Sequence, residues 1–250
     1  MRTATRHSRW AIPTAVGAAG IAAVATLADG VLESGDLAAY DPVVTAGVVT
    51  ARTPLLTAIA QAFTFTGSMV MVALYTLAVV AWLGLRRRQW RLAALVAGTM
   101  ATSAALTVVL KLAFGRARPA AADVLGALDL TFAFPSGHTL NSTVFFGLLA
   151  ALAVAHVRSR PGRAGVVAAW LAMVVGVAAS RVYLGYHWLT DVLAGCGVGV
   201  VVLAAAALVA RRLDVVPGPA GISPPAGRRW SPGPPRGAGR TSAAPPRPPA

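Results

Sequence analysis

Six long apolar runs, each separated from the next by a short polar segment, dominate the hydrophobic pattern of the chain. Each run is about the 20 residues that an α-helix needs to cross the roughly 30 Å of hydrocarbon in a bilayer. The runs cover 11–28, 68–85, 92–114, 139–157, 164–182 and 189–210. The pattern therefore predicts an all-α fold: an integral membrane helical bundle with six transmembrane helices, contained in residues 1–212.

Three segments need a separate interpretation. Residues 42–66 are only mildly apolar and favour an interfacial helix lying on the outer surface. The first run competes with a cleaved signal peptide, but it is longer than the 7–15 apolar residues of a signal sequence, so we expect a retained span. Residues 213–250 are dominated by Pro, Gly, Ser, Ala and Arg, and such a composition predicts a disordered cytoplasmic tail.

Composition supports the membrane assignment and changes how the net charge is interpreted. Hydrophobic residues make up 56% of the chain and charged residues only 12%, whereas a soluble domain carries about 25% charged residues. The net charge of +14 would suggest nucleic acid, but its cations lie in short linkers and in the tail. Membrane topology and anionic lipid head groups explain that placement better, and we expect no nucleic-acid partner.

The Lys and Arg residues of the linkers predict the orientation of the bundle. They occur near the N-terminus, at 86–91, at 158–163 and at 211–212. In a six-span topology all four positions fall on one side, which the positive-inside rule assigns to the cytoplasm. We therefore expect a multi-pass protein of a bacterial inner membrane with both termini cytoplasmic. The segments 29–41, 115–138 and 181–188 then face outward.

Three short polar segments, called polar islands below, are expected on this outward side: Lys111–Pro119, Phe134–His138 and Ser180–Asp191. Charged groups at membrane depth cost roughly 2.5–3.5 kcal/mol each, so they indicate function. Each island has a plainer interpretation by itself, namely a snorkelling lysine, an ordinary helix start or an interfacial histidine. Together they supply cations, amide and hydroxyl donors at a helix N-terminus, two histidines and a carboxylate, which are the groups that phosphoryl transfer needs.

The third island also predicts a nucleophile. If the last helix begins near His187, Asp191 lies one turn along on the same face. Its carboxylate can accept a hydrogen bond from one imidazole nitrogen and leave the other free to attack. The chain has no Asp/Glu cluster of the kind that holds two metal ions, so the residues favour a metal-free mechanism without a cofactor. The single cysteine, Cys196, lies in an apolar run and gives no disulfide or metal spacing.

The three islands match, in order and spacing, a three-part signature: K-x6-RP, PSGH and SR-x5-H-x3-D. Its eleven specified residues occur without a substitution. The chain resembles the type 2 phosphatidic acid phosphatase and vanadium haloperoxidase superfamily, in its six-span membrane phosphatase branch. The resemblance covers 11–210 as architecture, while the specific residues fall within 111–191.

The resemblance implies a role for each matching residue. His187 is expected to be the nucleophile that forms a phosphohistidine, and Asp191 is expected to orient it. His138 is expected to protonate the leaving alkoxide and then to activate water. The phosphoryl oxygens are expected to bind Lys111, Arg118, Ser136, Gly137 and Arg181. Arg116 lies outside the signature, and we expect an exposed loop arginine there.

The function that follows is a membrane phosphatase that cleaves a phosphate or pyrophosphate monoester from a lipid at the outer face. Candidate substrates are undecaprenyl pyrophosphate, phosphatidic acid, phosphatidylglycerol phosphate and diacylglycerol pyrophosphate. A vanadate-dependent haloperoxidase fits the same site, although halide oxidation does not explain the membrane spans. A non-catalytic lipid-phosphate binding or transport protein would not need both His138 and His187. A phosphatase for soluble sugar phosphates stays open.

Overall fold

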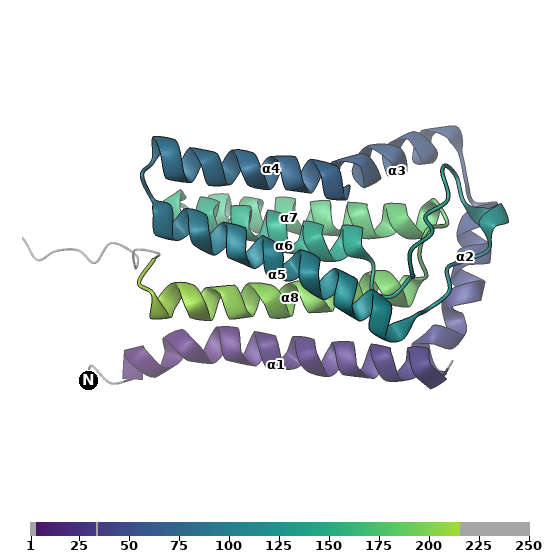
Figure 1. The fold of residues 1–250 in the computed structure, drawn as a ribbon, viewed down its shortest axis with the longest axis horizontal. Helices are drawn as coiled ribbons and strands as arrows, with labels where there is room; N and C mark the ends of the chain where they lie inside the picture. Colours follow the sequence, from purple (N-terminus) through teal and green to yellow (C-terminus); the bar gives the residue numbers. More distant parts are fainter. Residues whose placement is uncertain (1–3, 34, 216–250) are drawn as a thin grey trace, which may run out of the picture. The chain divides into compact units, whose positions relative to one another are not determined.

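The computed structural model of the chain describes residues 4–33 and 35–215, and within them the fold is entirely helical (Figure 1). Six helical segments of this part are long and apolar enough to cross a membrane. They are Trp10–Glu33, Met69–Arg86, Trp90–Phe114, Gly137–His156, Arg160–Tyr183 and Leu189–Arg212. The prediction of an all-α bundle with six spans is confirmed. The tail predicted over 213–250 lies, from residue 216 on, outside the described residues.

The helices follow one another without long excursions, apart from the connection before α6. Their bounds are α1 Ala4–Glu33, η1 Asp36–Tyr40, α2 Asp41–Thr50, α3 Pro54–Thr66, α4 Met69–Ala81, η2 Trp82–Arg86, α5 Trp90–Phe114, η3 Ala121–Asp123, α6 Gly137–His156, α7 Arg160–Tyr183 and α8 Leu189–Arg212. The central helix is α6, which packs against α4, α5, α7 and α8. The main apolar core accordingly forms around its buried residues Leu140, Val144 and Phe145.

Helix α1 packs on α8 through small residues (Figure 1). A Cβ atom on Gly20 would lie 2.9 Å from Val201, and one on Gly197 would lie 2.7 Å from Val24. Glycines at such positions let two helices approach closely, which is the usual basis of helix association in membranes. The first apolar run therefore packs in the bundle as one of its six long apolar helices.

The segment 42–66 forms two helices, where the hydrophobic pattern suggested one interfacial helix. The chain breaks after Thr50, and Thr53 and Pro54 begin α3 as its N-cap and first residue. The Thr53 side chain accepts a hydrogen bond from the amide of Leu56 at 3.3 Å, which is the usual start of a helix. In Figure 1, α2 crosses the end of the bundle, and α3 runs alongside α7.

The connection 115–136 is irregular apart from η3, and backbone hydrogen bonds fix it to the junction between α7 and α8. The amide of Leu125 donates to the carbonyl of Leu184 at 2.9 Å, and the amide of Ser136 donates to the carbonyl of Asp191 at 3.0 Å. The polar segments on either side of α6 are therefore held together.

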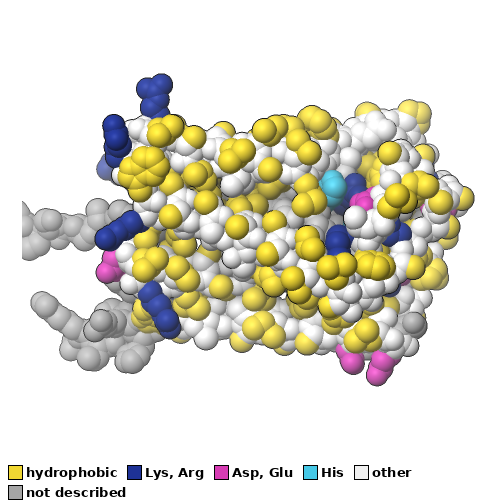
Figure 2. All heavy atoms as spheres, viewed as in Figure 1, with side chains coloured by type: hydrophobic (Ala, Val, Ile, Leu, Met, Phe, Trp, Pro, Cys, Tyr) yellow, Lys and Arg dark blue, Asp and Glu magenta, His cyan; other side chains and the backbone are white. Residues whose placement is uncertain are grey.

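Exposed arginines gather at the opposite end of the bundle. They come from the α4–α5 turn, the α6–α7 turn and the end of α8, namely Arg86, Arg87, Arg88, Arg91, Arg158, Arg160, Arg163, Arg211 and Arg212. Figure 2 shows dark-blue side chains along the left-hand end of the view, where these helix ends lie.

Candidate active site

The end of the bundle away from these arginines brings the three polar islands together. Arg118 of the first island donates from Nη1 to the carbonyl of Tyr186 in the third island at 2.7 Å. The second island joins the third through Ser136 and Asp191, as described above. In Figure 2 a histidine, Lys or Arg side chains and an acidic side chain lie close to one another near this end.

His187 and Asp191 form a buried pair. His187 is 1% exposed and Asp191 is 0% exposed. The imidazole Nδ1 lies 3.3 Å from Asp191 Oδ2, and the same oxygen accepts a hydrogen bond from the amide of Trp188 at 2.9 Å. Helix α8 begins at Leu189, so His187 lies in the turn before the helix, and the carboxylate that caps the helix reaches back to it.

The other imidazole nitrogen, Nε2, faces Arg118, with its Nη1 at 3.3 Å. Burial, followed by the charges of Arg181 and Arg118, lowers the pKa of His187 well below its usual value. The imidazole is therefore neutral at physiological pH. With Nδ1–H donating to Asp191, the lone pair is on Nε2, which is the form that a nucleophile requires.

A loop between η3 and α6 holds two of the cations. Arg118 donates from Nε to the Thr131 carbonyl and from Nη2 to Asp129 Oδ2, both at 2.7 Å. Lys111 donates from Nζ to the carbonyl of Phe132 and to Thr131 Oγ1. Burial lowers the pKa of Arg118. Burial alone would raise the pKa of Asp129, but hydrogen bonds from Thr131 and the charge of Arg118 outweigh it and lower that pKa, so Asp129 is ionised.

Arg181 is held deep in the site. It is 4% exposed, its Nη1 donates to Thr64 Oγ1 at 2.8 Å, and its guanidinium lies 4.0 Å from the ring centroid of Tyr186. The ring of Tyr186 therefore packs on this arginine. Within the described residues, Arg181 Nε is buried without a hydrogen-bond partner. Such a donor costs about 1–3 kcal/mol, which an anion bound here would compensate.

The start of α6 closes the site from another side. Ser136 occupies the N-cap position and is fully buried. A Cβ on Gly137 would lie 2.8 Å from Thr107 Cγ2, so only glycine allows α5 and α6 to approach this closely. His138 follows on the first turn, within electrostatic range of Arg181 and His187, and it forms no hydrogen bond inside the described ranges. The free amides of this helix start suit an anion.

Arg116 corrects the sequence interpretation, which expected an exposed loop arginine. Its side chain is only 16% exposed and forms salt bridges to Asp41 at 2.7 Å and to Asp191 at 2.5 Å. Nη1 also donates to Thr190 Oγ1 at 2.8 Å. The expectation was wrong because both carboxylates lie 75 residues away along the chain, where no local pattern connects them to Arg116.

Sequence reasoning also missed Asp41, Asp129 and Thr64. Asp41 is 1% exposed at the start of α2, but in the sequence it is one of several acidic residues between two apolar runs. Asp129 and Thr64 have no distinguishing neighbours. No group of three or more His, Cys, Asp or Glu side chains in the described part of the chain is arranged to hold a metal ion.

A six-span helical bundle with a buried histidine–aspartate pair among fixed cations has the architecture of a membrane phosphatase. Comparison with known proteins gives the family. The PAP2 superfamily profile matches residues 92–214. Phosphatidylglycerophosphatase B of Bacillus subtilis (strain 168) is 30% identical over 164 residues, which are 64% of this chain and 77% of that protein. The chain therefore belongs to the PAP2 superfamily, and it is a multi-span membrane phosphatase.

Two solved structures share the fold. The crystal structure of a transmembrane PAP2-type phosphatidylglycerolphosphate phosphatase from Bacillus subtilis superposes with a TM-score of 0.67 at 24% identity, covering 80% of this chain and 96% of that one. Aquifex aeolicus LpxE superposes with a TM-score of 0.51 at 22% identity, covering 67% and 94%. Both similarities concern the arrangement of helices.

Proposed function

We propose that the protein hydrolyses the phosphate monoester of a membrane lipid at the outer face of the cell membrane, through a phosphohistidine on His187. The observation that carries the proposal is the orientation of this buried imidazole. Nδ1 faces Asp191, and Nε2 faces the guanidinium of Arg118. A neutral imidazole fixed in this way directs its lone pair toward a group that arginines can bind.

The reaction proceeds in two steps. His187 Nε2 attacks phosphorus, the P–O ester bond breaks, and its electron pair stays on the lipid alkoxide, which takes a proton from His138. Water then attacks the phosphorus of the phosphohistidine, the P–N bond breaks, and His138 accepts the proton of the water. The products are the lipid alcohol and inorganic phosphate.

Five groups hold the phosphoryl oxygens in this mechanism. Lys111, Arg118 and Arg181 neutralise the charge of the equatorial oxygens, and Ser136 and the amide of Gly137 donate hydrogen bonds at the start of α6. The buried Nε of Arg181 is the clearest support, because an anion supplies the acceptor that the described residues do not provide.

Phosphatidylglycerol phosphate is the first substrate to test, because the Bacillus subtilis relative is named a phosphatidylglycerophosphatase. Phosphatidic acid and undecaprenyl pyrophosphate are the comparison lipids. The exposed arginines at the other end of the bundle support a cytoplasmic location of that end and of both termini, with the site outside. Residues 1–212 carry the activity in this proposal.

The direct test is phosphate release by the purified, detergent-solubilised protein in EDTA, against these three lipids and a sugar phosphate. We expect one lipid to be preferred and EDTA to have no effect. His187→Ala should abolish release, whereas His156→Ala should retain it, because His156 is an exposed histidine at the far end of α6. Full activity of His187→Ala would exclude the histidine nucleophile.

The covalent intermediate needs its own experiment. With p-nitrophenyl phosphate, the leaving group departs without an acid, so His138→Ala should form the phosphoenzyme but hydrolyse it slowly. We expect acid-labile, alkali-stable radiolabel on this variant and none on His138→Ala/His187→Ala. Alkali-labile label would indicate a different nucleophile.

A further inference from the structure

Arg116 joins three segments that lie far apart in the sequence. It lies on the connection after α5, and its partners are Asp41 at the start of α2 and Thr190 with Asp191 at the start of α8. Asp41 in turn accepts hydrogen bonds from the amide of Thr190 at 3.0 Å and from its hydroxyl at 2.5 Å. One guanidinium therefore lies between two buried carboxylates, and Arg116 and Asp41 both bind residues of the first turn of α8.

This network occupies the oxygen of Asp191 that does not face the histidine. Arg116 binds Oδ1, while Oδ2 accepts from Trp188 and approaches His187. Because both oxygens are engaged, the carboxylate cannot rotate about its side chain without losing a charge-assisted hydrogen bond. The direction of Oδ2, and hence of the imidazole, depends on Arg116.

We propose that Asp41 and Arg116 are a positioning pair for the reaction: they fix the orientation of Asp191 and, through it, that of His187. The inference rests on the proposed function, since it assigns no contact with substrate to either residue. Outer partners of this kind hold a catalytic group in productive geometry, and small displacements of the group strongly reduce the rate.

Arg116→Gln tests the pair. We expect kcat to fall by about 10- to 100-fold with KM changed less than about threefold, because the cations assigned to the phosphate stay in place. Arg116→Lys should recover part of the rate, because an ammonium group can bind one carboxylate but cannot bind two at once as the planar guanidinium does. Asp41→Asn should cause a smaller loss. The double variant should be no slower than Arg116→Gln, because the two residues act as one unit.

Arg52→Gln is the matched control. Arg52 is also half-buried at this end, and it donates to the carbonyls of Asp123 at 2.6 Å and Tyr183 at 2.9 Å without touching Asp191. The Arg52→Gln substitution should lower the thermal midpoint without a selective loss of kcat. Equal kinetic effects of the two arginine substitutions, or a wild-type kcat in Arg116→Gln, would overturn the positioning role.

A measurement that needs no turnover tests the positioning role of Asp41 and Arg116 independently of the proposed function. In nitrogen-15 histidine spectra, the His187 signal, assigned with His187→Gln, should report the Nδ1–H tautomer in the wild type and a mixture in Arg116→Gln. Unchanged tautomers would contradict the positioning role even if the enzyme is active. An inactive wild type with the expected spectra would contradict only the proposed function.

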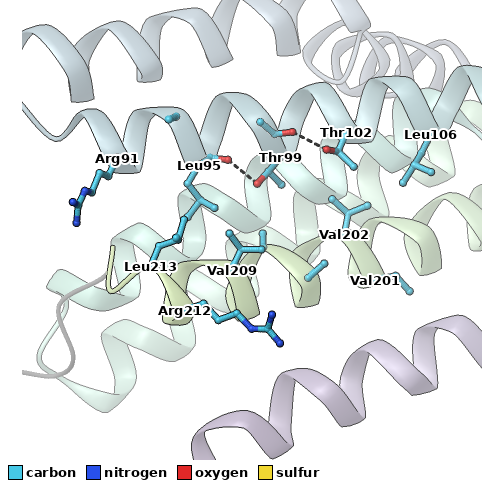
Figure 3. Close-up of a pocket in the computed structure, with 14 residues that line it drawn as sticks. Arg91, Leu95, Thr99, Thr102, Leu106, Val201, Val202, Val209, Arg212 and Leu213 are labelled. Atoms are coloured by element: carbon cyan, nitrogen blue, oxygen red, sulfur yellow. Dashed lines mark hydrogen bonds between the residues drawn. The ribbon is translucent and has the colours of Figure 1, made fainter.

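The bundle also has a groove that extends to its basic end. This groove of about 900 Å³ lies between α5 and α8 (Figure 3). Its threonines are satisfied by their own helix: Thr99 Oγ1 donates to Leu95 at 2.7 Å and Thr102 Oγ1 donates to Gly98 at 2.9 Å. The groove is therefore apolar along its length. The charged residues that line it are Arg91 and Arg212, at the end where α5 begins and α8 ends.

The dimensions and charge of the groove match a phospholipid of one leaflet. Along α5 its lining runs from Arg91 to Leu106, which is roughly 22 Å at 1.5 Å per residue. One leaflet with its head-group region is half of the bilayer, which is roughly 20–22 Å. Neither arginine forms a hydrogen bond or ion pair with another described residue, so both are available to a phosphate. A substrate tail that enters from the candidate active site would leave these two charges unused.

We infer that this groove binds one anionic glycerophospholipid, with the phosphate at Arg91 and Arg212 and an acyl chain along α5 and α8. Lipid binding is measured by titrating the solubilised protein with phosphatidylglycerol or phosphatidylcholine. Native mass spectrometry detects the bound lipid, and the thermal midpoint reports the stabilisation. The wild type should retain phosphatidylglycerol and gain a higher midpoint with it than with phosphatidylcholine. Arg91→Gln/Arg212→Gln should weaken this response at least tenfold, and Arg158→Gln/Arg160→Gln, at the same end but outside the groove, should not.

A glycine pair tests the apolar part of the groove. Gly98 lines the groove, and a Cβ there meets nothing within 4 Å, so Gly98→Leu places a branched apolar side chain in the groove. Gly165 on α7 is equally open and lies outside the groove. Gly98→Leu should lose the bound lipid and Gly165→Leu should keep it. Unchanged lipid binding in Gly98→Leu would overturn the inference. A KM that rises in Gly98→Leu for lipid substrates but not for soluble ones would also overturn it, because the groove would then hold the acyl chain of the substrate.

Discussion

At the scale of single residues, the site depends on partners that the signature does not contain. Arg181 provides the example, because the guanidinium is fixed by Thr64 on α3 and by the ring of Tyr186. Arg118 is fixed by Asp129 in the same way. The signature residues supply the groups of the proposed chemistry, and these neighbours determine where each cation points.

Thr64→Val should raise KM about tenfold, because a hydrogen bond to a charged group contributes about 1.5–3 kcal/mol and here holds Arg181. Thr66→Val on the same helix is the control, since that hydroxyl bonds only its own helix at Ala62. Steady-state kinetics on both variants check this. Equal KM values in the two would mean that Thr64 does not position Arg181.

The lowered pKa of His187 gives a pH prediction. Burial keeps the folded-state pKa below the usual value of about 6.5, so the imidazole stays deprotonated and reactive as the pH falls through 6.5. The acid limb of kcat/KM that belongs to the enzyme should therefore lie below pH 6.5, after correction for the second ionisation of the substrate phosphate. An enzyme limb at or above 6.5 would contradict the buried, neutral imidazole.

At the scale of elements, the turn between α7 and α8 carries His187, the proposed nucleophile. After Tyr183 the chain reverses at Gly185, and the amides of Tyr186 and His187 both donate to the Arg181 carbonyl, at 3.0 and 3.2 Å. This folds His187 back over the end of α7. Gly185 has a φ of +79°, and a Cβ there would collide with the carbonyl oxygen of Asp123.

Gly185→Ala should therefore destabilise the protein by about 1–3 kcal/mol and reduce activity, because the turn must open to relieve the contact. Gly165→Ala, at an open helical position, should be neutral or stabilising by up to about 1 kcal/mol. Thermal unfolding in detergent distinguishes the two. A neutral Gly185→Ala would show that the turn adapts without strain.

At the scale of the whole molecule, the described part of the bundle has a basic end and an end that holds the candidate active site. The exposed arginines belong to the turns at one end, and the three islands lie at the other (Figure 2). Because basic segments prefer the cytoplasm, we propose that the basic end lies inside and the candidate active site faces outward, where a substrate in the outer leaflet can reach it.

Cysteine labelling tests this orientation, because the chain has only Cys196 to remove. In a Cys196→Ala background, Leu128→Cys in the connection before α6 should react with a membrane-impermeant maleimide on intact cells. Arg158→Cys in the α6–α7 turn should react only after permeabilisation. The reverse pattern would place the site in the cytoplasm.

The sequence alone predicted the spans, because burial in lipid leaves a signature about 20 residues long that needs no tertiary information. The sequence also predicted which polar islands belong together, because Lys111, His138 and His187 are parts of one ordered motif. The break before α3 was missed, because the mild hydrophobicity of 42–66 suggested one helix, although Thr53 and Pro54 form a local helix start.

Tertiary structure alone decided which groups surround the motif. Asp41 and Arg116 are 75 residues apart, and Thr64 and Arg181 are 117 apart, so no helical or strand period relates them. Their pairing follows from the packing of α2 and α3 against α7 and α8, which brings polar side chains together in a buried place where each must find a partner. Long-range electrostatic pairing in a buried site is a property of the folded bundle, whereas the spans themselves are a property of the local sequence.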